Sequence, residues 1–207
     1  MMYLQKVFMP LLQEDTSLFE NIRCCKSCSL CNNQPPLLSP MPDASPVIMV
    51  VGTSAKQIKS PAEVPLDGST RSGKIVSRLE AVSLKYGYGI YRTNLVKCPP
   101  VNDVNKLRYP TKEEIAACIG NLFQEIELLA PKIVLLLGKI VISAMEHEIG
   151  AKFSDYSGCT FSTLTVGHQR YVAAYHPSFV SKSPKLTEEY VSNFAEMLTR
   201  EFGGENS

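Results

Sequence analysis

Four of the seven cysteines of this chain crowd into one short run, Cys24-Cys25-Lys-Ser-Cys28-Ser-Leu-Cys31. A close pair of thiolates, joined by others that the fold brings in, is the usual ligand pattern of an iron–sulfur cluster, and tetrahedral zinc uses the same ligands. Cys25 with Cys28 and Cys28 with Cys31 have equal spacing, so spacing alone does not choose the pair. The run predicts a metal site whose metal and ligand pair stay open.

A second run, Tyr91-Arg-Thr-Asn-Leu-Val-Lys-Cys-Pro-Pro100, joins a strand pattern to a double proline. Proline has no N–H for a strand ladder or a helix interior, so regular structure must end there. Asn94 then lies on the strand and Cys98 at its end. Cys118 falls in the second turn of a helix that the capping box Thr111-Lys-Glu-Glu114 opens. We expect Cys98 and Cys118 to complete a four-cysteine site; the alternative is that they are buried cysteines that act as small hydrophobic residues.

A third polar feature, Tyr175-His-Pro-Ser-Phe179, follows the apolar run Tyr171-Val-Ala-Ala174. Proline fixes the local φ angle, so His176 is presented in a set direction at the end of a strand. Taken alone, a histidine in this setting is more often a satisfied residue of the core. We expect His147, on a helix, and His168, in a turn, to be surface residues.

Apolar runs that end at turn residues predict the strands that must position these groups. They lie at 47–51, 90–96, 132–138 and, as one or two strands with a turn at Gly167-His168, within 159–175. Helical patterns begin at Gly73, Thr111, Lys139 and Ser183-Pro184. Strands that alternate with helices predict a three-layer α/β/α fold with a central, mainly parallel four-stranded sheet.

We expect one domain over residues 1–207, in which the cluster cysteines tie an N-terminal segment of about 1–46 to the sheet. The polar stretch Thr53–Ser72 lies beyond the carboxyl end of the first strand, where ligands bind in open α/β sheets.

The composition excludes some partners and compartments. Lys plus Arg number 21 and Asp plus Glu number 20, so any nucleic-acid binding must use a local patch. No apolar run approaches the roughly 20 residues that cross a bilayer, and no signal-peptide pattern opens the chain. We therefore expect no membrane association and a cytoplasmic, reducing location, where clustered cysteines favour ligation over disulfides.

Four segments together resemble one family. They are Arg92-Thr-Asn-Leu-Val-Lys-Cys-Pro-Pro100, Glu113-Glu-Ile-Ala-Ala-Cys118, Pro131-Lys-Ile-Val-Leu-Leu-Leu-Gly138 and Tyr175-His-Pro-Ser178. In this order they resemble the iron–sulfur (family 4) branch of the uracil-DNA glycosylase superfamily, and the similarity runs from about Cys24 to Phe179.

This resemblance implies a cofactor and its ligands. The family pattern Cys-x-x-Cys-x-Leu is matched with Leu30 in place, which favours Cys25 and Cys28 over Cys31. It also favours a [4Fe–4S] cluster over zinc. Cys98 and Cys118 match the other two ligands, although the loop from Val101 to Tyr109 between them is longer than is usual in the family.

The resemblance also implies a reaction on DNA, in which the target nucleotide is flipped out of the stack and its glycosidic bond is hydrolysed. Asn94 would hydrogen-bond the uracil edge, with Gly52 and Leu66 beside the base. His176 would stabilise charge on the departing base. The loop that carries Ser178 and Phe179 would contact DNA.

In the same loop, Val180 would belong with Phe179 to an apolar tip that wedges into the base stack. Lys182 and Lys185 would meet phosphates. The alternative for each residue is an ordinary turn with solvated lysines.

The chain departs from the family pattern at the first motif. The family has a glycine followed by an acidic residue, and later Pro-Phe-x-Gly, whose ring stacks on the base; this chain has Gly52-Thr-Ser-Ala55 and Pro65-Leu-Asp-Gly68. Thr53, Ser54 or backbone groups would then hold the attacking water, because a dissociative reaction needs less base strength than attack on a stable carbonyl. Asp67 or Glu63 is the candidate for the missing carboxylate.

Three functions follow as hypotheses. The first is a monomeric DNA glycosylase that excises uracil or a related modified base from single- or double-stranded DNA, with a repair or replication protein as a further partner. The second is a non-hydrolytic nucleic-acid-binding or replication-associated module that keeps the fold and the cluster. The third is an enzyme of free nucleotides or nucleosides, which would act without DNA.

Overall fold

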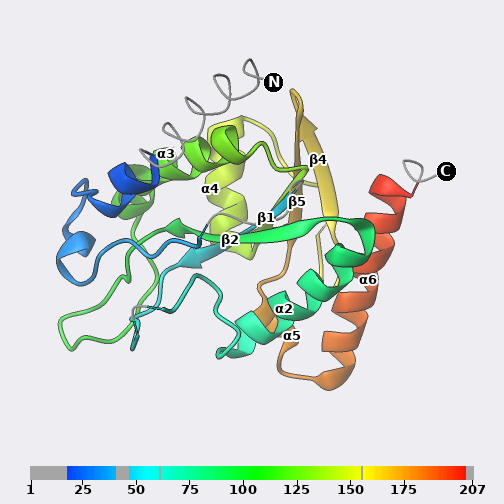
Figure 1. Ribbon diagram of the computed structural model, residues 1–207, viewed down its shortest axis with the longest axis horizontal. Coiled ribbons are helices and arrows are strands. Elements are labelled where there is room, and N and C mark those ends of the chain that lie inside the picture. The colour runs from blue at the N-terminus through cyan, green and yellow to red at the C-terminus, as the bar shows by residue number, and fades with distance from the viewer. Residues whose placement is uncertain (1–17, 41–46, 61, 155, 204–207) are drawn as a thin grey trace, which may run out of the picture.

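The computed structural model describes residues 18–40, 47–60, 62–154 and 156–203, and residues 1–17 and 41–46 of the predicted N-terminal segment lie outside this part. A five-stranded sheet in the order β2-β1-β3-β5-β4 forms its centre (Figure 1). The strands are β1 (Val47–Ser54), β2 (Gly89–Val96), β3 (Ile133–Leu137), β4 (Ser162–Val166) and β5 (Gln169–Ala174). The pairs β1–β2, β1–β3 and β3–β5 are all parallel, which confirms the mainly parallel sheet.

The prediction of four strands is wrong, because the region 159–175 contributes a complete hairpin. β4 pairs antiparallel with β5, from Ser162 opposite Ala173 to Val166 opposite Gln169. Gly167 and His168 form the two-residue turn, and Gly167 has a φ of +60°, which glycine adopts at little cost. β4 is only partly buried at the sheet edge, so its sequence lacks the continuous apolar run of a central strand.

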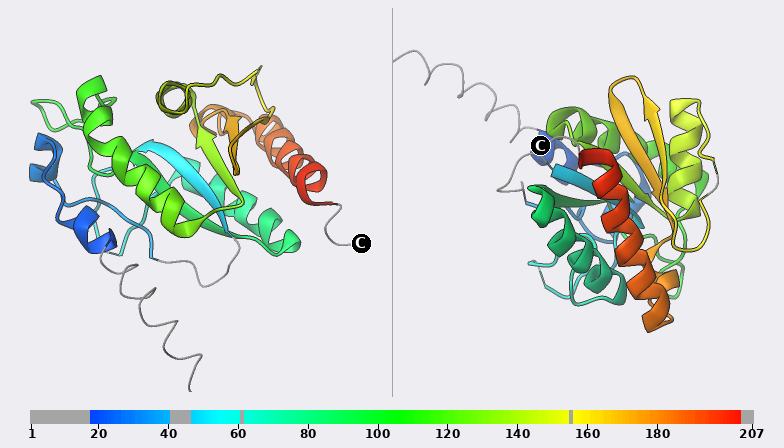
Figure 2. Two further views of the ribbon diagram at one scale, coloured as in Figure 1. Left: turned by 90° about the horizontal axis from the view of Figure 1, so that it is seen from above. Right: turned by 90° about the vertical axis from the view of Figure 1, so that its right-hand side faces the viewer.

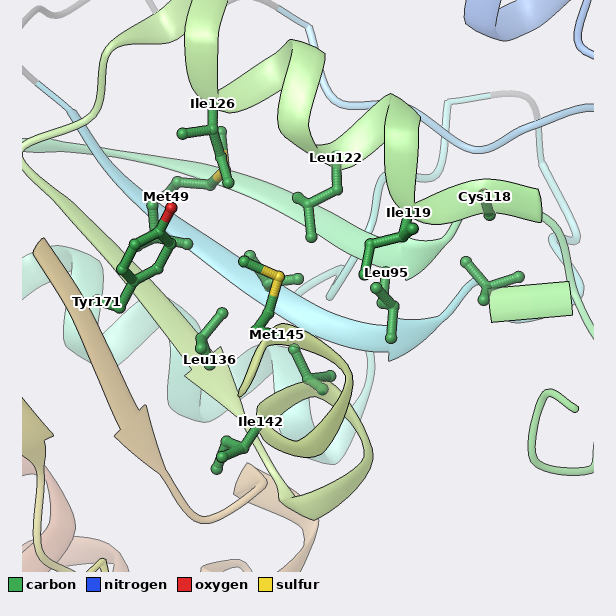
Figure 3. Close-up of a cluster of buried hydrophobic side chains, with 14 of the residues drawn as sticks. Met49, Leu95, Cys118, Ile119, Leu122, Ile126, Leu136, Ile142, Met145 and Tyr171 are labelled. Carbon is green, nitrogen blue, oxygen red and sulfur yellow. The ribbon is translucent and has the colours of Figure 1, made fainter. Parts of the chain in front are cut away.

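Helices cover both faces of the sheet, as the two views of Figure 2 show, so the three-layer arrangement is confirmed. The helices are α2 (Arg71–Ser83), α3 (Lys112–Leu129), α4 (Lys139–Ile149), α5 (Pro177–Val180) and α6 (Pro184–Phe202), with short 3-10 turns at Ser29–Asn32 and Leu84–Tyr86. α3 and α4 pack on one face, where Leu122, Ile126 and Met145 point at the strands (Figure 3). α2 and α6 cover the other face. Among the described residues no helix is long and apolar enough to cross a membrane.

Three of the predicted helix starts hold, whereas α2 begins at Arg71, two residues before the predicted start at Gly73, with Thr70 as its N-cap. The Thr111 hydroxyl accepts from the N–H of Glu114, and the Glu114 carboxylate accepts from the N–H of Thr111, so the capping box is confirmed. Ser183 precedes α6 as expected, but its hydroxyl makes no capping hydrogen bond. Pro184 at the first helical position supplies the start signal there.

The described N-terminal segment lies along the edge strand β2. Residues 18–23 are helical, and the extended part that follows is held by hydrogen bonds to the strand's end. The N–H of Leu37 donates to the carbonyl of Lys97 at 2.7 Å, and the Ser39 hydroxyl donates to the carbonyl of Arg92 at 2.6 Å. These bonds place the clustered cysteines close to Cys98.

A buried ion pair joins the end of β2 to α3. Lys97 is 1% exposed, and its ammonium group is paired with the carboxylate of Glu125, which is 0% exposed. The same ammonium donates to the Thr93 hydroxyl at 2.7 Å and to the main-chain carbonyl of Asn94 at 2.8 Å. Tyr91 and Thr93 donate to the carboxylate. Every polar atom of the group is thus satisfied, which is what makes burial of two charges tolerable.

Removal of one charged partner should lower the free energy of unfolding. We expect Glu125→Ala to lower the free energy of unfolding by about 3–5 kcal/mol, because it leaves the Lys97 ammonium buried without a counter-charge. The double replacement Lys97→Met with Glu125→Leu should recover most of that loss. Urea denaturation of the variants measures both effects.

The matched control is Glu188→Ala, which removes an exposed pair between α6 and Arg78. Exposed pairs contribute little, so its midpoint should stay near that of the parent protein. Equal losses for Glu125→Ala and Glu188→Ala would contradict the role of the buried pair.

Candidate functional site

A cleft of about 910 Å³ opens where the parallel strands end. Thr53 lies in the last two residues of β1 and Asn94 in the last three residues of β2, whereas Gly138 follows β3 and His176 follows β5. All four line this cleft. Carboxyl ends of parallel strands share one edge of the sheet, so residues distant in sequence meet there. Leu66, Asp67 and Ser178 complete the set of predicted residues that line the cleft.

Asn94 supplies a polar group that faces the cleft from a buried position. The residue is only 3% exposed, and its carboxamide has no hydrogen-bond partner among the residues that the structure describes. Gly52 lies opposite Asn94 in the strand register, and a Cβ atom at Gly52 would come within 2.6 Å of the Asn94 Oδ1 atom and 3.3 Å of the Leu66 side chain. Glycine is therefore required at this position for the carboxamide to lie where it does.

His176 is held from two sides. Gly138 has a φ of +89°, and a Cβ atom there would come within 2.9 Å of the His176 Cβ atom, so glycine again makes room. The imidazole Nδ1 atom accepts from the main-chain N–H of Ser178 at 3.2 Å and contacts its hydroxyl at 2.9 Å. Burial lowers the pKa of His176. The ring is thus neutral at pH 7 and, because Nδ1 accepts, carries its proton on Nε2.

The loop between β1 and α2 brings Leu66 and Asp67 into the cleft. Leu66 has a φ of +51°, which is uncommon for a residue with a side chain. Its carbonyl accepts from the Arg92 guanidinium at 2.9 Å, and the guanidinium is itself paired with Glu80 at 2.6 Å. The Asp67 carboxylate accepts from the N–H of Ser69 at 2.8 Å, and these hydrogen bonds lower the pKa of Asp67, so the group is ionised at neutral pH.

Glu63, the other candidate carboxylate, lies outside the cleft lining. It is paired with Lys56 and accepts from the N–H of Lys59 at 2.7 Å. The Glu63 carboxylate thus stabilises its own loop. Of the two candidate carboxylates, only Asp67 lines the cleft.

The segment after His176 forms the short helix α5, which the sequence did not predict. Phe179 is 41% exposed and lies edge-on to Tyr175 at a centroid distance of 4.8 Å, with the Lys182 ammonium 5.4 Å from its ring. Val180 is different from the prediction: it is fully buried in the core that α2 and α6 cover, so it cannot belong to an exposed tip. A helical turn points successive side chains in different directions, which separates Val180 from Phe179.

The clustered cysteines meet at a second, small cavity. Cys25, Cys28, Cys31, Cys98 and Cys118 all line it. Burial, together with the four neighbouring thiols, raises the pKa of Cys98 to about 12. Among the described residues, no group of three or more His, Cys, Asp or Glu side chains is arranged so that it could hold a metal ion. Cys24 is exposed and lies outside this lining.

Asn121 links two of these sulfurs, a contact that no sequence pattern predicted. Its side-chain N–H group donates to Cys118 Sγ at 3.8 Å and to Cys25 Sγ at 4.0 Å. The main-chain N–H of Lys97 also donates to Cys118 Sγ, at 3.4 Å. Hydrogen bonds to ligand sulfurs are a common feature of iron–sulfur sites.

Sequence reasoning also missed part of the cleft wall. Leu107, Arg108 and Tyr109 line it from the loop between β2 and α3, and Lys139 lines it from the start of α4. The unusual length of that loop was the available signal, but loop length alone does not say where a loop folds.

Comparison with known proteins agrees with this geometry. The sequence pattern of the "Uracil DNA glycosylase superfamily" matches residues 41–199. A type-4 uracil-DNA glycosylase of Pyrobaculum aerophilum is 28% identical over 183 residues, which cover 86% of this chain and 90% of the relative. Proteins of the same name from Archaeoglobus fulgidus and Thermotoga maritima are 25% and 26% identical, over 86% and 79% of this chain and 88% and 81% of the relatives. With a superfamily match over more than half of its length, this chain belongs to the uracil DNA glycosylase superfamily.

Proposed function

We propose that this protein is a DNA glycosylase that binds a flipped-out uracil, or a related modified base, and hydrolyses its N-glycosidic bond. The observation that carries the proposal is the Asn94 carboxamide, which is buried at the same cleft as His176 and has no hydrogen-bond partner among the described residues. The type-4 names of the relatives support the same activity.

Asn94 supplies recognition of the base. A carboxamide both donates and accepts, so it can donate to uracil O4 and accept from uracil N3–H. Cytosine offers an amino group at C4 and no N–H at N3, so it cannot make this pair of bonds. The closeness of Gly52 and Leu66 to the carboxamide restricts how the base can lie against it.

His176 stabilises the leaving group. As the C1′–N1 bond breaks, its electron pair passes to the base, and negative charge builds on uracil O2. A neutral imidazole with its proton on Nε2 donates a hydrogen bond to that oxygen. Ser178 holds the ring in this protonation state through Nδ1. The interaction strengthens only as charge develops, so it lowers the barrier more than it improves binding.

Asp67 and Thr53 act on the sugar side of the broken bond. An ionised carboxylate in the cleft stabilises the positive charge of the oxocarbenium-like sugar, and the Thr53 hydroxyl holds the water that attacks C1′. The water's proton passes to the Asp67 carboxylate, and Asp67 is a sufficient acceptor because the intermediate is already strongly electrophilic. Ser178, Phe179 and Lys182 then contact the DNA strand beside the flipped nucleotide.

Cys25, Cys28, Cys98 and Cys118 hold a [4Fe–4S] cluster in this proposal. In a zinc site all four sulfurs lie about 2.3 Å from one ion and are therefore close together, whereas each cysteine of a four-iron cluster binds a different iron. The thiols that line one small cavity are the candidate ligands of such a cluster. The cluster would serve as a cross-link between the N-terminal segment, β2 and α3.

A non-hydrolytic DNA-binding module is the second candidate, favoured by Thr53 where the family has an acidic residue and by Leu66 where it has an aromatic ring. The two candidates differ in whether His176 matters for base release, and the following experiment separates them.

We expect His176→Ala to reduce single-turnover uracil release about 100- to 1000-fold, because it removes a donor to the developing oxyanion. Affinity for uracil-containing DNA should change far less. The assay is quantification of abasic sites in labelled single- and double-stranded oligonucleotides. His168→Ala, in the β4–β5 turn, is the matched control and should behave as the parent protein.

The pH profile tests the protonation state of His176. Its pKa is lowered, so the neutral ring persists as the pH falls through about 6.5, the ordinary value for histidine. The rate should be flat from pH 8 to about 6.5 and decline only below that range, where Nδ1 gains a proton and loses its bond from Ser178. A rate that rises as the ring protonates would refute a neutral donor.

Asn94→Asp should reduce uracil excision at least tenfold, because a carboxylate cannot donate to O4 and repels it. A carboxylate accepts from an amino group, so the same variant should gain measurable release of cytosine. Chromatography of bases released from uracil- and cytosine-containing strands measures both. Unchanged uracil release would show that Asn94 does not contact the base.

Cysteine variants identify the cluster ligands. We expect Cys98→Ala and Cys25→Ala to lose iron and the visible iron–sulfur absorbance, while Cys31→Ala and the exposed control Cys24→Ala keep both. Iron and zinc analysis of protein purified without oxygen gives the measurement. Loss of iron in Cys31→Ala with retention in Cys25→Ala would assign Cys28 and Cys31 as the ligand pair instead.

A further inference from the structure

Residues 101–109, the loop between β2 and α3, fold into a compact hairpin at the mouth of the cleft, here called the rim hairpin (green, lower left in Figure 1). Val101 and Leu107 form an isolated antiparallel bridge. The N–H of Asn102 donates to the carbonyl of Lys106 at 2.9 Å, and the Asn102 side chain accepts from the N–H groups of Lys106 and Val104. The backbone polar groups of the rim hairpin thus find most of their hydrogen-bond partners within the hairpin itself.

Two anchors fix the rim hairpin against the rest of the protein. The Arg108 guanidinium makes a double hydrogen bond to the Glu114 carboxylate, at 2.8 and 2.6 Å, and donates to the carbonyl of Val101 at 3.1 Å. The Gln57 side chain, in the loop after β1, donates to the Asn105 side chain at 2.7 Å. The hairpin is therefore a positioned wall of the cleft.

This fixed hairpin leaves large apolar side chains in water. Val104 is 69% exposed, Leu107 is 51% exposed and Tyr109 is 76% exposed. Leu107 and Tyr109 also line the cleft that holds Asn94 and His176. Apolar groups that gather at a binding cleft, on a backbone held in place, indicate a surface that a ligand covers.

The charges around the hairpin indicate the chemistry of that ligand. Lys106 is exposed between the apolar residues, and Lys139 is exposed in the same cleft; neither has an ion-pair partner in the part of the chain that the structure describes. An aromatic ring and an aliphatic side chain with free cations beside them match a polyanion that also offers flat apolar faces. Nucleobases on a phosphate backbone have this combination.

We propose that the rim hairpin binds an unpaired base next to the target nucleotide, with the Tyr109 ring stacked on that base and Leu107 packed at its edge. The proposal rests on the proposed function, since it places the strand in the same cleft. In a duplex, the base next to a flipped-out nucleotide stays paired with the opposite strand and stacked on its other neighbour, so it is held in the helix and cannot turn onto the Tyr109 ring. The rim hairpin therefore makes the protein favour single-stranded over double-stranded DNA.

The test uses the full-length protein and binding without excision. The probe is an oligonucleotide with 2′-fluorodeoxyuridine, whose glycosidic bond resists hydrolysis, and 2-aminopurine beside it, once on the 5′ and once on the 3′ side. Tyr109→Ala should weaken single-strand binding about tenfold, a typical effect of losing one stacked base, and leave duplex binding nearly unchanged. Tyr109→Phe should bind as the parent does.

Fluorescence gives an independent measurement. Binding to the parent protein or to Tyr109→Phe should quench 2-aminopurine on one of the two sides, and Tyr109→Ala should abolish that quenching. Leu107→Ala should weaken single-strand binding, whereas Leu84→Ala should not; Leu84 is a comparably exposed leucine, at 57%, outside the cleft lining.

Two outcomes would overturn the proposal: equal losses on single and double strands, or single-strand affinity and quenching that Tyr109→Ala leaves intact. Failure of the proposed function is a separate result. A protein that releases no uracil but binds single strands through Tyr109 refutes the glycosylase and keeps the rim hairpin. One that releases uracil while Tyr109→Ala binds as the parent keeps the glycosylase and refutes the rim hairpin.

Discussion

The buried pair between Lys97 and Glu125 connects the cleft of this molecule to its cysteine cavity. Charges without water are stable only when each is fully paired, so the end of β2 and the middle of α3 are held in one arrangement. The Lys97 ammonium also binds the Asn94 carbonyl. Asn94 precedes Lys97 and Cys98 follows it, while Cys118 lies two turns before Glu125 on α3. One interaction thus sets the cleft and the cysteine cavity relative to each other.

The shape of the cleft depends on glycines that leave room for its polar side chains as much as on those side chains themselves. Gly52 and Gly138 each lie where a side chain would collide with Asn94 or His176. Leu66 is held in an uncommon backbone conformation by Arg92, so strain at the cleft is balanced by a paired charge behind it. The base-binding residues of the proposal are therefore held in advance, and binding does not have to order them.

The sequence supported the fold well because the strong signals were local. The apolar runs of β1 and β3, the capping box of α3 and the start of α4 were all confirmed. The number of strands was wrong because β4, at a half-exposed edge, carries a weak pattern. Val180 was misplaced because a loop was expected where α5 forms. Which side chains share the cleft depends on strand order, which local patterns do not contain.

The sequence by itself determined the residue types: a cysteine run, Asn94 at a strand end, His176 before a proline, and their resemblance to one family. Only the tertiary structure decided which of them meet. It brings Asp67 into the cleft and leaves Glu63 outside, places five cysteines at one cavity, and turns the long loop after Cys98 into the rim hairpin. The physical reason is that residue type and spacing set what a group can do, whereas packing and burial set what it faces.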